Sequence, residues 1–241
     1  MMSTWGTSLI RVLLRLLPSG LVVRVLAGPG RGMWWLPESM PHGAWLGTLE
    51  RGQLDGFVVR IVPGTTVWDV GANVGLYTLP SARATGSSGA VYAFEPVQRN
   101  LEYLRQHVGL NRLENVHIVD AAVGQVSGVV RMAAGASPSE ASVNEAGALQ
   151  VRAITLDGWR ENAQAPFPSL IKIDVEGAEE HVLAGAFETL KKTRPTIFLS
   201  LHGERQRIGC RSILERLSYR IASLQPGASV DVATEWIAEG R

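Results

Sequence analysis

The strongest constraint on the fold is an alternation between two patterns of apolar residues, which begins at Thr66. Short continuous apolar runs alternate with longer segments in which apolar residues recur at helical spacing. The runs that we expect to form strands are 67–70, 90–94, 116–119, 170–173 and 196–201. Strands that are separated by helices join through crossover connections, so the sequence predicts a doubly wound, mostly parallel α/β sheet.

Two of the intervening segments carry additional helix signals. One is predicted to run from Pro96 to Val108, with Gly109 just after its end, and the other begins near Gly177. Proline is favoured at the beginning of a helix and glycine after its end, and acidic residues in the first turn of the second helix complement its dipole. With 241 residues, 46% of them hydrophobic, the chain can bury one large core.

The organisation of the chain changes near residue 62. We expect residues 63–241 to form the α/β domain and residues 1–62 to form a helical and irregular lead-in. The turn-rich segment 28–32 ends the apolar N-terminal part of this lead-in. The apolar run 57–62 at its other end is predicted to be a strand.

A short apolar helix is predicted within residues 9–17. Arg11 and Arg15 share one of its faces, and leucine and valine cover the remainder. Such a helix can make a peripheral membrane contact, or it can pack on the main domain or on a second copy of the chain. We favour packing, because three arginines are few for a membrane-surface helix and no apolar run reaches the roughly 18 residues of a membrane span. We expect a cytoplasmic protein, with membrane association and homo-oligomerisation as open alternatives.

Charge and cysteine content exclude several classes of protein. Lys and Arg number 23 against 22 Asp and Glu, and no concentrated basic run appears. We therefore expect no nucleic-acid partner. Cys210 is the only cysteine, which excludes an internal disulfide and a cysteine-based zinc site and permits a reducing compartment.

Polar side chains follow the predicted strands at the points where the strands end. Ligands of doubly wound sheets bind outside the carboxyl ends of the strands, so we expect these side chains to line one crevice. They are Asp69, Glu95, Asp120, Asp174 with Glu176, and His202.

The turn after the first strand indicates the kind of ligand. Gly71 and Gly75 allow a sharp turn and a close approach of ligand to backbone, while Asn73 stands between them. Asp69, just before the turn, suits a cationic amine better than a phosphate. Glu95 lies 20 residues beyond Gly75, where a carboxylate can accept hydrogen bonds from a ribose diol. An adenosyl ligand with a charged amino-acid tail and no phosphate fits this pattern.

Two alternatives concern the same turn. An NAD-dependent oxidoreductase on a Rossmann sheet would need the pattern G-x-G-x-x-G, whereas this turn reads G-x-N-x-G, with a side chain in place of the middle glycine. The second alternative is that Asn73 only stabilises the turn and does not contact a ligand, because asparagine tolerates the left-handed conformation that tight turns require.

Three motifs occur in a recognisable order: 67–75 (VWDVGANVG), 92–96 (YAFEP) and 171–179 (IKIDVEGAE). They resemble the FkbM family of S-adenosylmethionine-dependent methyltransferases, and the third motif is the most specific. The stretch 45–50 (WLGTLE) is similar to a segment that many members carry before the domain. The resemblance covers about residues 45–202.

This resemblance implies a Rossmann-like methyltransferase fold with a seven-stranded sheet and S-adenosylmethionine as cofactor. It also implies transfer of a methyl group to a hydroxyl oxygen of a small molecule, typically a sugar or a natural product. On that basis Asp69, Gly71, Asn73, Gly75, Glu95 and Asp120 are the expected cofactor-binding residues.

Methylation of a hydroxyl requires help in removing its proton. The sulfonium methyl group is already activated, but a protonated alcohol is a poor nucleophile, so a base or a metal must assist. Asp174 is the leading candidate for the base, because it ends the fourth strand. Glu176 and His202 can share that role, or they can bind a divalent ion such as Mg²⁺ together with Asp174.

Structural explanations compete with each of these roles. Asp174 and Glu176 can cap the helix that follows them, and His202 can make a structural hydrogen bond. Lys172, inside an apolar strand, is expected to be ion-paired or to extend its amine towards water rather than to take part in catalysis. A non-catalytic ligand-binding domain of the same fold would keep the strand-end residues without using them.

The segment 133–148 consists of small and polar residues with Val143 as its only large apolar residue. It cannot bury a face, so we predict a loop or the tip of a hairpin. Acceptor specificity is expected to reside there and in the N-terminal residues.

Overall fold

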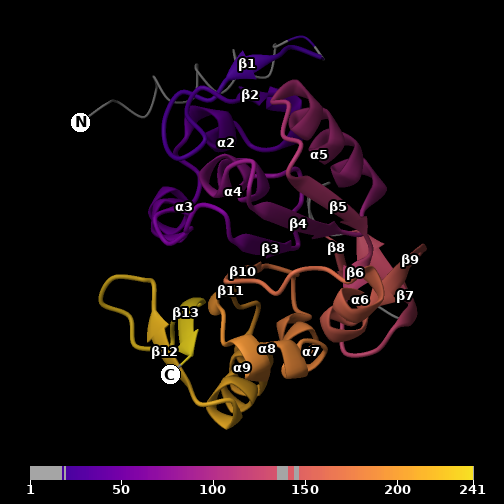
Figure 1. Ribbon diagram of the computed structural model, residues 1–241, viewed down its shortest axis with the longest axis vertical. Coiled ribbons are helices and arrows are strands. Elements are labelled where there is room, and N and C mark those ends of the chain that lie inside the picture. The colour runs from indigo at the N-terminus through magenta and orange to yellow at the C-terminus, as the bar shows by residue number, and fades with distance from the viewer. Residues whose placement is uncertain (1–17, 19, 135–140, 144–146, 241) are drawn as a thin grey trace.

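A seven-stranded sheet forms the centre of the molecule (Figure 1). The computed structural model describes residues 18, 20–134, 141–143 and 147–240. In the strand order of the sheet, β12-β13-β11-β10-β3-β4-β5, the five strands from β11 to β5 run parallel. The bounds are β3 Thr66–Val70, β4 Ala90–Glu95, β5 Val116–Asp120, β10 Leu170–Ile173, β11 Thr196–Ser200, β12 Tyr219–Ser223 and β13 Glu235–Gly240. The predicted doubly wound, mostly parallel α/β sheet is confirmed.

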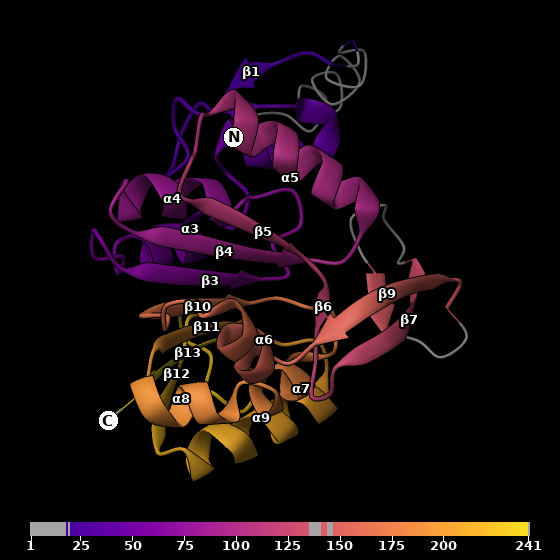
Figure 2. The same ribbon diagram turned by 45° about the vertical axis from the view of Figure 1, so that its right-hand side comes forward.

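Helices cover both faces of this sheet (Figure 2). On one side lie α3 Arg51–Val58, α4 Thr78–Thr85 and α5 Gln98–Leu110. On the other side lie α6 Leu156–Ala163, α7 Glu179–Ala184, α8 Phe187–Thr193 and α9 Glu204–Arg216. Each helix presents an apolar stripe to the sheet, as the 3.6-residue period predicts.

The strands contribute alternate residues to two cores. In β3, Val67 packs in the core beneath α3 and α4, whereas Trp68 packs in the core beneath α7, α8 and α9. In β11, Phe198 packs in the same core as Val67, and Ile197 packs in the same core as Trp68. Because side chains alternate along a strand, a strand that is covered on both faces is expected to be mostly apolar. This explains why the strand segments read as apolar runs, with Asp69 and Lys172 as buried polar exceptions.

The predicted strand at 57–62 is wrong, because this stretch contains the end of helix α3. Leu54, Phe57 and Ile61 are buried at helical spacing, while Val59 and Val62 are 78% and 61% exposed. Phe57 makes edge-to-face contacts with neighbouring aromatic rings of α4 and β11. The apolar run therefore belongs partly to an amphipathic helix and partly to the surface, and helical periodicity prevails over its β-branched composition.

The predicted helix after Gly177 is two short helices, α7 and α8. They are separated at Gly185, where an added Cβ would lie 2.0 Å from the carbonyl oxygen of Gly124. The backbone of another segment thus approaches the chain too closely for a side chain at this point.

The lead-in shares its core with the α/β sheet. Its elements are β1 Val23–Arg24, β2 Trp34–Trp35, the 3₁₀ turn Pro37–Ser39 and α2 Gly43–Leu46, and β1 pairs antiparallel with β2. The side chain of Asn111, the C-cap residue of α5, accepts a hydrogen bond from Trp34 N and donates one to Trp34 O. Residues 1–17, which contain the predicted N-terminal helix, lie outside the described residues.

A second sheet of four strands follows β5 in the chain. Its strands are β6 Ala122–Val123, β7 Gly128–Ala134, β8 Ala141–Val143 and β9 Leu149–Ile154, in the order β6-β9-β7-β8. β7 and β8 pair antiparallel, so the described part of 133–148 forms the two arms of a hairpin. Among the described residues, no helix is both long and apolar enough to cross a membrane.

His107 joins the lead-in to the glycine turn after β3. This fully buried imidazole donates from Nδ1 to Val74 O at 2.7 Å, accepts from Leu36 N at Nε2 at 3.0 Å, and stacks on Trp35. Accepting at Nε2 requires the neutral ring with its proton on Nδ1. Burial lowers the pKa of His107 to about 4.

We expect His107 to make stability sensitive to acid. The unfolded chain binds a proton at this residue below a pKa of about 6.5, whereas the folded chain resists protonation down to about 4. The stability advantage of the parent over His107→Gln should therefore shrink as pH falls from 6.5 to 4, by up to about 3 kcal/mol. Urea unfolding of both proteins across this range measures it. An advantage that is constant with pH would contradict the assignment.

Candidate active site

A cavity of about 260 Å³ opens at the carboxyl ends of β3, β4 and β10. Its wall combines residues of the lead-in with the glycine turn and the loops after β4 and β10. Six of the residues that the sequence singled out line it: Asp69, Gly71, Asn73, Glu95, Asp174 and Glu176. The expected convergence of strand-end residues is thus present, and the lead-in adds a wall that strand periodicity did not predict.

The glycine turn touches the loop that follows β10. A Cβ on Gly71 would lie 1.8 Å from Asp174 O, and the φ of Gly71 is +85°. Gly75 has a φ of +105°, and a Cβ there would meet the side chain of Leu79 at 2.4 Å. Asn73 adopts the left-handed conformation, with a φ of 50°, which fits its alternative role in the turn.

The main-chain N–H groups of this turn are largely engaged within the protein. The N–H groups of Gly71 and Ala72 both donate to Phe94 O, and that of Gly75 donates to Ala72 O. Asn73 N donates to Glu95 Oε2 at 2.9 Å. A pyrophosphate would need such groups as donors, so the turn is poorly suited to a dinucleotide.

Glu95 is almost fully buried at the cavity wall, with 4% of its surface exposed. Burial raises its pKa to about 7, although hydrogen bonds from Val97 N, from the side chain of Asn100 and from Asn73 N act in the opposite direction. These donors hold both carboxylate oxygens in place. Oε1 accepts two of these hydrogen bonds, whereas Oε2 accepts only that from Asn73 N and keeps a lone pair that can accept a hydroxyl hydrogen from a ligand.

Asp69 is also buried, and its Oδ2 accepts a hydrogen bond of 2.5 Å from the hydroxyl of Thr78. Burial raises the pKa of Asp69 to about 6. Asp174 and Glu50 add to this increase through their negative charge. The cavity therefore carries several carboxylates close together, an arrangement that favours a cationic ligand group.

Asp120 is at the end of β5 but does not line the cavity. Its side chain is 56% exposed and lies 3.6 Å from Arg105 NH2. The two residues that follow it, Ala121 and Ala122, line the wall instead. The structure therefore places the backbone after β5, rather than the Asp120 carboxylate, at the cavity.

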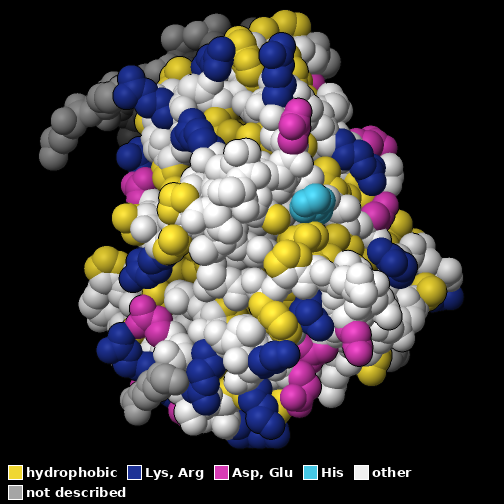
Figure 3. All heavy atoms as spheres, in the orientation of Figure 1, with side chains coloured by type: hydrophobic (Ala, Val, Ile, Leu, Met, Phe, Trp, Pro, Cys, Tyr) yellow, Lys and Arg dark blue, Asp and Glu magenta, His cyan; other side chains and the backbone are white. Residues whose placement is uncertain are grey.

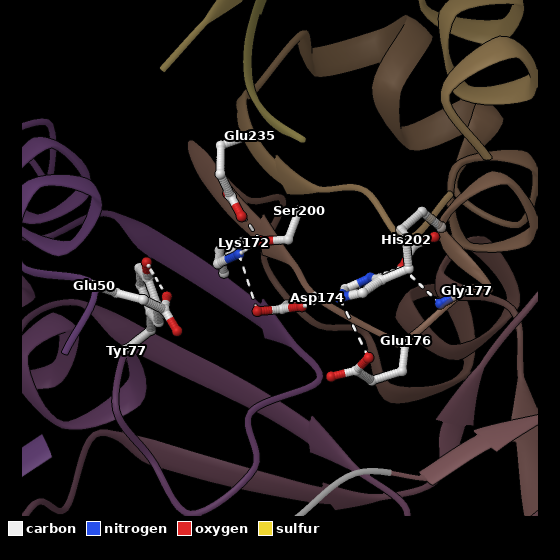
Figure 4. A network of polar contacts seen from close by, with 10 residues as sticks. Glu50, Tyr77, Lys172, Asp174, Glu176, Gly177, Ser200, His202 and Glu235 are labelled. Atoms are coloured by element: carbon white, nitrogen blue, oxygen red, sulfur yellow. Dashed lines mark hydrogen bonds and ion pairs between the residues drawn. The ribbon is translucent and has the colours of Figure 1, made fainter. Parts of the chain in front are cut away.

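Asp174, Glu176 and His202 meet at the edge of the cavity (Figure 4). His202 Nε2 lies 3.2 Å from Glu176 Oε2 and 3.8 Å from Asp174 Oδ1. Its Nδ1 forms a 2.8 Å hydrogen bond with Oε1 of Glu179. This hydrogen bond, followed by the charges of the surrounding carboxylates, raises the pKa of His202 to about 9 against the effect of burial.

The helix-capping alternative for Asp174 and Glu176 is wrong. Ala178, and neither of these acids, occupies the N-cap position of α7. The side chain of Asp174 instead faces Lys172 on one side and His202 on the other.

A buried polar cluster beside Asp174 was not predicted from the sequence. Lys172 is 2% exposed, lies 3.4 Å from Asp174 Oδ2 and donates a hydrogen bond to the hydroxyl of Ser200. Burial alone would lower the pKa of Lys172, but Asp174 and Glu235 raise it above its ordinary value. The ion pair expected for Lys172 is present. The sequence did not indicate which acidic residues would surround it.

Tyr77 and Glu50 complete this cluster on the lead-in side. The Tyr77 hydroxyl donates to Glu50 Oε2 at 2.8 Å, and the Lys172 amine lies 5.1 Å from the centre of the Tyr77 ring. All three residues line the cavity. The family-like stretch 45–50 was the only sequence signal for Glu50.

Comparison with known proteins identifies the family. The family description "Methyltransferase FkbM domain" matches residues 69–221, well over half of the chain. The chain belongs to the FkbM methyltransferase family. A curated relative, hexuronic acid methyltransferase AglP of Haloferax volcanii, is 28% identical over 150 residues, covering 58% of this chain and 59% of AglP. This FkbM chain thus matches about three fifths of its curated relative.

Two solved structures share the fold of this FkbM protein. Methyltransferase FkbM from Methylobacillus flagellatus KT has a TM-score of 0.54 at 17% identity, over 82% of this chain and 53% of that one. Precorrin-6y C5,15-methyltransferase from Geobacter metallireducens GS-15 has a TM-score of 0.50 at 14% identity, over 78% and 86%. The Rossmann-like methyltransferase fold expected from the motifs is confirmed.

We expect Gly71 to be indispensable for the packing of the two loops. Gly71→Ala combines a steric overlap with Asp174 O and a left-handed φ, and it should lower the free energy of unfolding by about 3 kcal/mol or more. Gly227→Ala is the matched control, because Gly227 has a φ of +77° but no heavy atom within 4 Å of an added Cβ. The control should cost only about 1–2 kcal/mol. Equal losses in urea unfolding would show that the contact does not matter.

Proposed function

We propose that this protein transfers the methyl group of S-adenosylmethionine to a hydroxyl oxygen of a sugar or a related small molecule. The observation that carries the proposal is the cavity whose wall contains both Glu95 and Asp174. One carboxylate can bind the ribose of the cofactor, and the other can receive the proton of the acceptor. Membership of the FkbM family supports methyl transfer, and the name of the relative AglP supports a sugar acid as the class of acceptor.

Within this proposal, Oε2 of Glu95 accepts a hydrogen bond from the ribose diol. Asp69 and Glu50 supply negative charge for the sulfonium and the ammonium group of the cofactor. The engaged N–H groups of the glycine turn favour this phosphate-free ligand over NAD, which remains the alternative from the oxidoreductase class. Gly71, Gly75 and Asn73 contribute through the shape of the turn.

In the reaction that we propose, Asp174 acts as the base. Its carboxylate takes the proton of the acceptor hydroxyl, the oxygen attacks the methyl carbon, and the sulfur departs with the bonding electron pair. The enzyme must align these three atoms, which accounts for much of the rate enhancement in such a displacement. Lys172 holds Asp174 in place from the side away from His202. Glu176 is the next candidate for the proton acceptor, whereas His202, the other candidate from the sequence, has a pKa of about 9 and is therefore largely protonated at neutral pH.

Partners and location remain predictions. On the face shown in Figure 3, Lys and Arg side chains are interspersed with Asp and Glu, in line with an acceptor that is not a nucleic acid. Peripheral membrane contact and self-association through the N-terminal helix involve residues outside the described part of the chain. Vesicle sedimentation of the full chain tests the membrane contact, and sedimentation velocity tests self-association. Cell fractionation tests the cytoplasmic location.

We expect Glu95 to control cofactor affinity. Glu95→Gln should weaken binding of S-adenosylhomocysteine about 10- to 150-fold, because hydrogen bonds to a charged group contribute about 1.5–3 kcal/mol. In the parent, affinity should rise as pH increases through about 7, where the carboxyl group ionises. The variant should lack this dependence. Calorimetric titration measures both effects, with the exposed Glu102→Gln of α5 as control. Equal affinity in parent and variant would refute the ribose contact.

Asp174→Asn tests the base. The variant should bind S-adenosylhomocysteine like the parent but turn over about 10²–10⁴ times more slowly, which is the usual contribution of positioned proton transfer. Turnover is followed by mass spectrometry on an acceptor found in a screen of sugars and sugar acids. Full activity in the variant would remove Asp174 from catalysis. Binding of S-adenosylhomocysteine without methylation of any acceptor would favour the non-catalytic alternative.

A further inference from the structure

Three side chains from two neighbouring strand ends present their ligand atoms to one point. Asp174 and Glu176 follow β10, and His202 follows the adjacent β11. One carboxylate oxygen of each acid and one nitrogen of His202 all lie within 4.8 Å of one another. Figure 4 shows one edge of the His202 ring facing the carboxylates of Asp174 and Glu176.

The orientation of His202 is set by a fourth residue, Glu179. Its side chain has no exposed surface, and its Oε1 is bound to both His202 Nδ1, at 2.8 Å, and Gly177 N, at 2.9 Å. The other oxygen, Oε2, is buried without a hydrogen-bond partner among the described residues. Because Glu179 accepts a hydrogen bond from Nδ1–H, the Nε2 atom of His202 faces Asp174 and Glu176. This carboxylate–histidine arrangement is typical behind metal-binding imidazoles.

The distances suit an octahedral cation. With ligands at about 2.1 Å, adjacent ligand atoms lie about 3.0 Å apart and opposite ones about 4.2 Å apart. His202 Nε2 lies 3.2 Å from Glu176 Oε2 and 3.8 Å from Asp174 Oδ1, and both distances lie between these two values. Two carboxylates and one imidazole without a thiolate favour Mg²⁺ or Mn²⁺ over softer metals.

We propose that Asp174, Glu176 and His202 bind one divalent cation of the Mg²⁺ or Mn²⁺ type, and that Glu179 positions His202 for it. Asp174 and Glu176 line the cavity, so the remaining coordination positions of the cation face the space for the acceptor. Neighbouring oxygens of a sugar or sugar acid can occupy these positions. The role of the cation in holding the acceptor rests on the proposed function, whereas the binding of the cation does not.

The experiment is titration of the full chain with Mn²⁺, followed through the electron paramagnetic resonance signal of the free ion. We expect one Mn²⁺ per chain, displaced by excess Mg²⁺. His202→Ala and Glu176→Gln each remove a ligand and should weaken binding at least about tenfold. Glu179→Gln leaves all three ligands intact but should still weaken binding about 10- to 100-fold. Glu204→Gln, an exposed acid two residues after His202, is the matched control and should bind like the parent.

Binding of S-adenosylhomocysteine, measured on the same samples, shows that each variant is folded. If the parent binds this cofactor product but shows no saturable Mn²⁺ binding, the cation site is refuted while the proposed function stands. If all variants bind Mn²⁺ like the parent, the ion lies elsewhere and the inference is equally refuted. Binding of Zn²⁺ without Mn²⁺ contradicts the assigned class of cation. Mn²⁺ binding that depends on His202, in a chain that does not bind S-adenosylhomocysteine, supports the site and contradicts the proposed cofactor.

Discussion

The close approach of two backbones at Gly71 is the contact on which the rest of the site depends. β3 and β10 are adjacent parallel strands, so their carboxyl ends emerge side by side. Asp174 N donates to Val70 O at 2.9 Å, and Asp174 O lies where a Cβ of residue 71 would stand. The glycine turn at the cavity and the loop that carries Asp174 are therefore one packed unit. A displacement of either loop would move the other.

Burial of charge distinguishes this end of the sheet from an ordinary strand end. Asp69, Glu95, Lys172 and Glu179 are all nearly or completely buried. Removing an ion from water costs several kcal/mol unless partners compensate for it. Lys172 has the hydroxyl of Ser200 and the carboxylate of Asp174, whereas the two acids at the glycine turn have pKa values raised by burial. Such unfavourable placement is tolerated where ligand binding or catalysis requires it, and it concentrates negative charge around the cavity.

The lead-in is held at the site by His107 of α5 and by Asn111, the C-cap residue of that helix. Asn111 binds the main chain of Trp34, and His107 connects Leu36 with Val74 in the glycine turn. Further along the lead-in, residues 40, 41, 49 and 50 form one wall of the cavity. A segment outside the region matched by the family description thus helps to shape the pocket. This position makes the lead-in a natural place for differences in acceptor choice between relatives.

The sequence by itself determined the parallel strands and the residues at their ends. A strand covered on both faces is mostly apolar, so 67–70, 90–94, 116–119 and 170–173 are recognisable in the sequence. Parallel strands all end at the same edge of the sheet, so the polar residues at their ends form a set. The contacts among the side chains of that set were decided only by the tertiary structure. Glu179 looked like a residue complementing the dipole of its helix, yet it is buried against His202. The helix at 51–58, the break at Gly185 and the antiparallel edge β12–β13 likewise follow from long-range packing. Local periodicity records which face of an element is apolar, but it carries no information about which distant segment covers that face.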